Sequence, residues 1–201
     1  MPELIHQFSE LDINREYSYA DYLLWRFKER VELIRGKIRK MSAPGTEHQQ
    51  LSGNLFREFS VFLKGKPCKV FAAPFDVRLS PSVPLPDGKI YNVVQPDLCV
   101  ICDLQKLDAR GCLGAPDLVI EILSPGNNRK ELRDKYELYE SNGVQEYWVM
   151  MPTEQTLVIH TLQAGVYVPG RIFTKGDVVG STVLPGFQLD LNEVFEELPF
   201  S

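Results

Sequence analysis

Two acidic residues interrupt apolar stretches of the sequence that otherwise favour β-strands. Asp97 lies in VVQPDLCVI and Glu121 in PDLVIEIL, each with apolar neighbours on both sides. In an antiparallel hairpin, Asp97 lies six residues before Asp103 and Glu121 six residues after Ala115, so the two carboxylates face each other. Like charges in this position repel. Mg²⁺ prefers one or two carboxylates with retained waters, so the pattern predicts a Mg²⁺ (or Mn²⁺) site held by both acids.

A lysine follows on a helix that the sequence predicts over 129–140. Lys135 lies on the stripe of Leu132, Tyr136 and Tyr139, at a position that an apolar residue would normally occupy. We expect its ammonium to point toward the core and to reach the two carboxylates. Two acids, a metal and a lysine provide the charge stabilisation and the easily deprotonated water that phosphodiester hydrolysis needs.

Each of these three residues also has a purely structural interpretation. Asp97 and Glu121 could be strand-end carboxylates that accept hydrogen bonds, because a buried carboxylate without a partner is costly. Lys135 could cover apolar surface with its stem while its ammonium stays in water. The sequence alone leaves these alternatives open.

The spacing of apolar residues predicts the elements that position these side chains. Helices are expected at 17–28 behind a Ser18 cap, 47–64, 129–140 behind an Asn128 cap, and 191–198. Strands are expected at 31–34 and 37–41 around an Arg35-Gly36 turn, and at 68–72, 75–79, 93–102, 118–123, 146–151 and 157–162. The segments 81–88 and 103–115 are expected to be loops.

This order of elements predicts an α/β (α+β) fold with a mixed central β-sheet flanked by the 47–64 and 129–140 helices. An N-terminal helix and hairpin precede the sheet, and short additional strands follow it. A chain of 201 residues is long enough for one core, so we expect one domain over 1–201.

Composition limits the classes of protein that fit. No apolar run approaches the ~20 residues that span a bilayer, and the N-terminus has no signal-peptide pattern, so we expect a cytoplasmic protein without membrane contact. Four cysteines are too few for a disulfide framework, and Cys99 and Cys102 should point to opposite faces of a strand rather than share a zinc ion. The net charge of −5 argues against tight non-specific binding to DNA.

At the level of whole segments, the chain resembles a known family. The order PDLCVI, PDLVIEILSP, Lys135 with Tyr139, and GVQEYWVM is similar to that of the bacterial "putative restriction endonuclease" family, which has unknown function and lies in the PD-(D/E)XK nuclease superfamily. VELIRGKIRKMSAPGTEHQ resembles its N-terminal signature and TVLPGFQLDLNEVF its C-terminal end, so the resemblance covers nearly the whole chain.

The resemblance implies a restriction-endonuclease-like core, metal binding by Asp97 and Glu121, and a catalytic Lys135. One departure is clear. The superfamily's Glu-x-Lys is here Glu121-Ile122-Leu123, so Lys135 must replace the strand lysine from the helix.

Two further residues fall in the N-terminal signature. Glu32 is either a third acid near the metal or a solvated residue of the hairpin. His48, at the start of the 47–64 helix, either faces the same cleft and contacts phosphate or is satisfied by a local hydrogen bond.

Two functions therefore stand as hypotheses. The first is a metal-dependent nuclease that hydrolyses DNA phosphodiester bonds with Asp97, Glu121 and Lys135, and with Glu32 and His48 as further candidates. The second is a catalytically weak or inactive binding or scaffold protein with the same fold, which would suit the acidic balance and the missing strand lysine. Because cleavage of both strands of a duplex favours two symmetric sites, we expect a homodimer.

Overall fold

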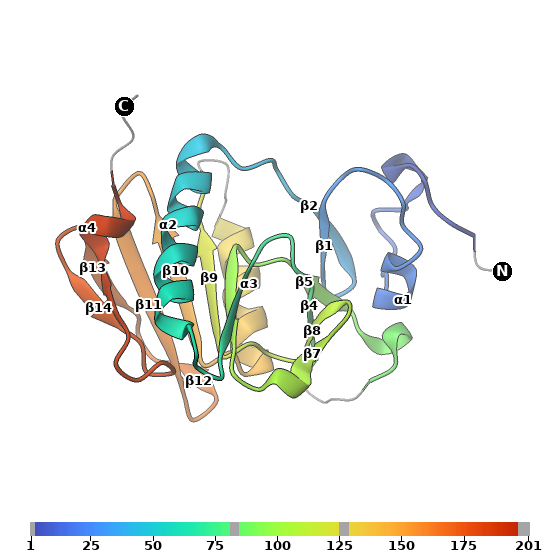
Figure 1. Cartoon of the computed structure of the whole chain (residues 1–201). Helices are drawn as coiled ribbons and strands as arrows, with labels where there is room; N and C mark the ends of the chain where they lie inside the picture. Colours follow the sequence, from blue (N-terminus) through green and yellow to red (C-terminus); the bar gives the residue numbers. More distant parts are fainter. Residues whose placement is uncertain (1–2, 81–84, 125–128, 197–201) are drawn as a thin grey trace.

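The computed structural model describes residues 3–80, 85–124 and 129–196. Within these ranges the strands form two large sheets and a small hairpin (Figure 1). The larger sheet has the order β12-β11-β10-β9-β6-β3, with β13 beside β11. Its strands are β3 (Lys69–Ala72), β6 (Leu98–Ile101), β9 (Leu118–Ile122), β10 (Glu146–Met151), β11 (Thr156–Gln163), β12 (Val166–Tyr167) and β13 (Arg171–Thr174). The sheet is mixed, as predicted, because β9 runs parallel to β10 and antiparallel to β6.

Two helices cover opposite faces of this sheet, α2 (Thr46–Leu63) and α3 (Arg129–Asn142). Successive strand residues alternate between the faces, so Ile120 packs in one cluster with Phe59 of α2, and Val119 packs in another with Tyr139 of α3. Figure 1 shows α2 and α3 on either side of β9 and β10. The prediction of a sheet flanked by these helices is therefore confirmed.

The helix boundaries follow local signals. α2 begins one residue earlier than predicted, after Gly45. α3 extends to Asn142 and ends at Gly143, whose φ of 84° suits a glycine stop. The predicted Asn128 cap lies outside the described residues.

The smaller sheet has the order β2-β1-β5-β4-β8-β7. Its strands are β1 (Val31–Ile34), β2 (Lys37–Lys40), β4 (Val77–Leu79), β5 (Asn92–Val94), β7 (Leu107–Asp108) and β8 (Gly111–Leu113). The predicted hairpin is confirmed: Arg35 and Gly36 both have positive φ, at 53° and 75°, as a tight two-residue turn requires.

The predicted strand over 93–102 is wrong. It is two strands, β5 and β6, that belong to different sheets. Pro96 lies between them, and because proline has no N–H to donate, the ladder ends there. Asp97 is consequently placed at the crossing from the smaller sheet to the larger one.

The predicted loop over 103–115 also needs correction, since it contains a 3-10 turn and the strands β7 and β8. Gly111 makes this possible. Its φ is 121°, and a side chain there would collide with the backbone oxygen of Asp76, so only glycine lets the chain pass this close to the segment before β4.

The terminal helices are shorter than predicted. α1 (Tyr19–Tyr22) has the expected Ser18 cap. The chain after it pairs with Ile5, whose backbone N–H donates to the carbonyl of Leu24 and whose carbonyl accepts from the backbone N–H of Arg26. α4 (Leu191–Val194) stops where Phe195 turns into the core, and 197–198 lie outside the described residues. Three 3-10 turns complete the described helical structure: η1 (Phe8–Glu10), η2 (Asp87–Lys89) and η3 (Leu104–Lys106). Residues 81–84 of the loop expected at 81–88 also lie outside the described ranges.

A buried acid ties the C-terminal hairpin, β14 (Val178–Gly180) and β15 (Gln188–Asp190), to the larger sheet. Glu146 is 1% exposed and accepts hydrogen bonds from the hydroxyls of Ser181 and Thr182, the backbone N–H of Thr182 and the indole of Trp148. These donors fully account for its burial, so Glu146 is a structural acid.

The cysteine count predicts no disulfide framework, but two of the four cysteines are paired. Cys68 and Cys102 form a disulfide between the segment before β3 and the end of β6, while Cys99 and Cys112 are free and buried. Cys99 and Cys102 pack in different core clusters, as predicted from their spacing, so they cannot form half of a zinc site. Disulfides persist mainly in oxidising compartments, so this disulfide does not support the predicted cytoplasmic location. The location stays a prediction. No helix in the described ranges has the length and apolarity needed to cross a membrane.

Candidate active site

Glu121 lies on β9 with its side chain on the α3 face of the larger sheet. Its Oε1 accepts a 2.6 Å hydrogen bond from the Tyr139 hydroxyl and lies 2.7 Å from Nζ of Lys135. Both donors come from α3 and lie on the face of this helix that packs against the sheet. The expectation that Lys135 reaches this carboxylate is confirmed, and its ammonium is not in open water.

Asp97 immediately precedes β6 and meets Glu121 in the register that the sequence predicts. β6 and β9 pair Leu98 with Ile120, so one further step places Asp97 opposite Glu121. Asp97 Oδ2 accepts a 2.7 Å hydrogen bond from the backbone N–H of Ile122, and Oδ1 lies 3.3 Å from Nε2 of His48.

Glu32 belongs to the same cluster and is not a solvated hairpin residue. It is 4% exposed on β1, and its Oε1 accepts the backbone N–H of Gln95 at 2.9 Å. The same oxygen lies 3.3 Å from Nζ of Lys135. Lys135 therefore connects Glu32 of the smaller sheet to Glu121 of the larger one.

His48 also joins the cluster. It lies in the first turn of α2, and its contact is with Asp97, which is far away in sequence, so the local hydrogen bond considered above is wrong. Burial lowers the pKa of His48, but the hydrogen bond and charge of Asp97 and the charge of Glu121 outweigh it and raise the pKa above its usual value. His48 is thus a cation-forming group beside two acids.

Glu121 is a buried acid with other carboxylates close by, and this environment changes its pKa. The pKa of Glu121 is raised to about 7, because burial and the neighbouring carboxylates of Asp97 and Glu32 raise it by more than Lys135 lowers it. Near neutral pH the carboxyl is therefore partly protonated, as expected for facing carboxylates without a metal.

Lys135 and Tyr139 keep their protons. Burial lowers the pKa of Lys135, but Glu121 and Glu32 together raise it above its ordinary value, so the amine stays an ammonium. Burial and the charge of Glu121 raise the pKa of the Tyr139 hydroxyl well above its ordinary value. Both groups are hydrogen-bond donors to Glu121 and neither can serve as a base.

The oxygens of the cluster fit a divalent cation that keeps most of its waters. Glu121 Oε2 receives no hydrogen bond from any described residue, and Asp97 Oδ1 contacts only His48 among them. The described residues contain no group of three His, Cys, Asp or Glu side chains that could hold a metal, so a complete protein cage is absent from them. Two carboxylates with waters are nevertheless the usual protein share of a Mg²⁺ site.

Comparison with known proteins gives the family. A family model described as "Uma2: Putative restriction endonuclease" matches residues 19–192, which include every member of the cluster. The chain belongs to this family. The match confirms the resemblance inferred from PDLCVI, PDLVIEILSP and the N-terminal signature.

Two further comparisons give context. An uncharacterized protein of Synechocystis sp. is 27% identical over 139 residues, which are 68% of this chain and 69% of that protein. A crystal structure described as a putative nuclease belonging to DUF820, from Anabaena variabilis, superposes with a TM-score of 0.70 at 18% identity and covers 89% of this chain and 97% of the other. The nuclease-like fold predicted from the sequence is thereby confirmed.

Sequence patterns alone do not reveal two participants. The helical stripe identifies Tyr139 only as a sheet-facing residue, although a tyrosine four residues after Lys135 on one helical face can reach the same carboxylate. The backbone N–H of Gln95, freed by the break at Pro96, carries no sequence signal that links it to Glu32.

Proposed function

We propose that this protein is a metal-dependent nuclease that hydrolyses DNA phosphodiester bonds. The observation that carries the proposal is the convergence of Glu32, Asp97, Glu121 and Lys135, from three strand regions and one helix, on a single buried cluster. Membership of the Uma2 family and the nuclease-like fold support it.

Asp97 and Glu121 would hold the metal through Oδ1, which contacts only His48 among the described residues, and Oε2, which receives no hydrogen bond from them. Mg²⁺ or Mn²⁺ bound there would neutralise charge on the phosphate and lower the pKa of a water. The N–H of Ile122 and the hydroxyl of Tyr139 fix the two carboxylates in place, so their free oxygens are oriented before a ligand arrives.

Lys135 acts as a fixed cation. Because its pKa is raised, the ammonium cannot take a proton from water, and its role is to stabilise negative charge that builds up on the reacting phosphate and to orient the attacking water. Glu32, anchored by the N–H of Gln95, holds Lys135 in this position from the opposite side to Glu121.

His48 is a second possible donor of the site. Held against Asp97 at the start of α2, it is placed to donate to a phosphate oxygen.

Cleavage of duplex and single-stranded DNA in Mg²⁺ or Mn²⁺ tests the proposal. We expect Asp97→Asn, Glu121→Gln and Lys135→Met each to lower the rate at least about 100-fold, the range typical for loss of a charged group at a hydrolytic centre. Glu137→Gln is the matched control, since Glu137 is an exposed acid of α3 that pairs with Arg35 and should leave cleavage unchanged.

The alternative is a non-cleaving binding protein. It is favoured by the absence of a three-donor metal group from the described residues and by the missing strand lysine. DNA binding without cleavage in either metal, unchanged by Glu121→Gln, would establish it and overturn the nuclease.

A further inference from the structure

An arginine next to the cluster is held by a neutral amide and not by an acid. Arg30 lies two residues before Glu32 and donates from Nε and Nη2 to the side-chain oxygen of Gln95, at 3.1 and 2.8 Å. It makes no ion pair with a described residue, whereas Arg15, Arg35 and Arg39 each pair with a carboxylate. In a chain of net charge −5, such a cation requires an explanation.

Gln95 is itself firmly fixed. It is 9% exposed, and its side-chain N–H group donates to Asp76 Oδ1 at 2.8 Å and to the Tyr22 hydroxyl at 3.3 Å. Tyr22 in turn donates to the same oxygen of Asp76. The amide thus stands between the guanidinium of Arg30 and the carboxylate of Asp76 and keeps the two charges from pairing directly.

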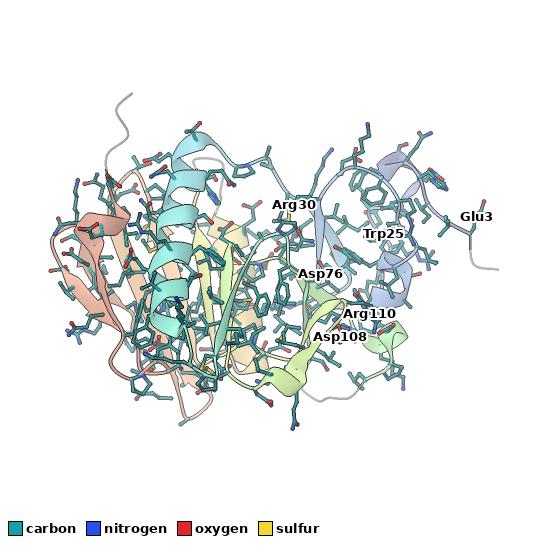
Figure 2. All side chains as sticks on the ribbon, viewed as in Figure 1. Glu3, Trp25, Arg30, Asp76, Asp108 and Arg110 are labelled. Atoms are coloured by element: carbon teal, nitrogen blue, oxygen red, sulfur yellow. A yellow bond between two sulfur atoms is a disulfide. The ribbon has the colours of Figure 1, made fainter. Side chains whose placement is uncertain are left out.

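The same glutamine ties this network to the site. Its backbone N–H binds Glu32, and the chain reaches Asp97 two residues later. Figure 2 labels Arg30 and Asp76 beside the strands of the smaller sheet. Arg30 is half-buried, and its Nη1 donates to no described residue, so one edge of the guanidinium stays free while the other is clamped.

We infer that Arg30 binds a non-bridging oxygen of a substrate phosphate, and that Gln95 is the residue that positions it. A clamped guanidinium with a free edge is pre-organised for an oxyanion, because arginine offers several donors in a fixed plane. The ligand class is a phosphodiester or a related phosphate. The inference rests on the proposed function for its choice of DNA as the source of that phosphate.

The salt dependence of DNA binding tests this role. The affinity of a duplex for the Glu121→Gln protein, which should not cleave, is measured by fluorescence anisotropy from low to moderate salt, with and without Arg30→Ala. Each phosphate contact contributes about 0.9 to the slope of log K against log salt, so we expect Arg30→Ala to reduce the slope by about 1 and the affinity about tenfold. A merely structural arginine would change the thermal midpoint but leave the slope as it was.

Three variants make the result specific. Arg26→Ala is the matched control, because Arg26 also donates only to neutral oxygens, those of Leu23 and Trp25, but has no contact with Gln95. It should leave the slope unchanged. Arg30→Lys should keep the slope and lose part of the affinity, and Gln95→Met should behave in the same way, since each retains the charge and loses the clamp.

A second readout separates this inference from the nuclease proposal. The Nε–H signal of Arg30, assigned with Arg30→Lys, is followed by NMR during titration with dimethyl phosphate and with inorganic phosphate. A shift of this signal in a protein that binds no DNA would keep the phosphate role and reject DNA as its source. An unchanged slope in Arg30→Ala, or no shift with either phosphate in a protein that does bind DNA, overturns the inference while leaving cleavage by the metal site standing.

Discussion

The ammonium of Lys135, on α3, lies 2.7 Å from Oε1 of Glu121, on β9. The two residues are fourteen positions apart in the chain, whereas the Glu-x-Lys pattern of the superfamily that the sequence resembles places them two apart on one strand. The helix thus brings a cation to the carboxylate, while Leu123 occupies the strand position two residues after Glu121. This contact depends on α3 staying packed against the larger sheet.

Replacing Lys135 should destabilise the protein in a pH-dependent way. Lys135→Met leaves Glu32, Asp97 and Glu121 without their common counter-charge, and removal of one partner of a buried pair costs about 3 kcal/mol or more. The loss should be full at pH 8 and smaller at pH 5, because Glu121 is then protonated. Urea unfolding at both pH values measures it, and an equal loss at the two would argue against coupling between these groups.

Glu121 and Glu146 are both buried acids, but they should respond oppositely to substitution. Without metal, Glu121→Gln should be nearly neutral or stabilising, because it removes a carboxylate that other carboxylates repel. Glu146→Gln should destabilise by about 1–3 kcal/mol, since an amide cannot accept from all of the donors on Ser181, Thr182 and Trp148. Thermal unfolding in EDTA compares them; a large loss for Glu121→Gln would identify Glu121 as a structural acid.

Stability should fall as the pH rises through the range in which Glu121 titrates. Its pKa is raised from 4.5 to about 7 in the folded chain, so its contribution is complete below 4.5 and is lost as the pH approaches 7. The shift corresponds to a stability change on the order of 3 kcal/mol. Unfolding measured from pH 4 to 8 should show this slope in the wild type and lack it in Glu121→Gln.

Much of this arrangement could be predicted from the sequence. Asp97 and Glu121 can be predicted to face each other because their strands pair symmetrically about the segment between them. Lys135 can be predicted to point inward because it lies on the apolar face of its helix. The Arg35-Gly36 turn and the ends of α3 have clear local signals. These features depend on residues close in sequence or on one pair of strands.

What could not be predicted depends on contacts between distant segments. Periodicity reads 93–102 as one strand, and only the two separate sheets show that Pro96 divides it. The pairing of Cys68 with Cys102 and the anchoring of Glu32 by Gln95 likewise require the sheets to be assembled. Apolar patterning shows which side of a strand is buried, but not which sheet the strand joins.

The protein should be a dimer of about twice the 22.9 kDa chain mass. Cleavage of both strands of a duplex favours two sites related by a twofold axis, and such dimers are the commonest oligomers. Sedimentation equilibrium at micromolar concentration measures the mass. A single species at the mass of one chain would remove the dimer from the account and leave single-strand or nicking activity for the site.

The binding of Mn²⁺ by the purified protein tests the central claim most directly, because it asks whether Asp97 and Glu121 form a metal site at all. By isothermal titration at pH 7.5 we expect about one Mn²⁺ per chain and strong weakening in Asp97→Asn and in Glu121→Gln, since each removes half of the carboxylate ligands. At pH 6 binding should also release about one proton, from the carboxyl of Glu121. If the wild type takes up no Mn²⁺, or if both variants bind it as well as the wild type does, the metal site does not exist and the binding-protein alternative replaces it.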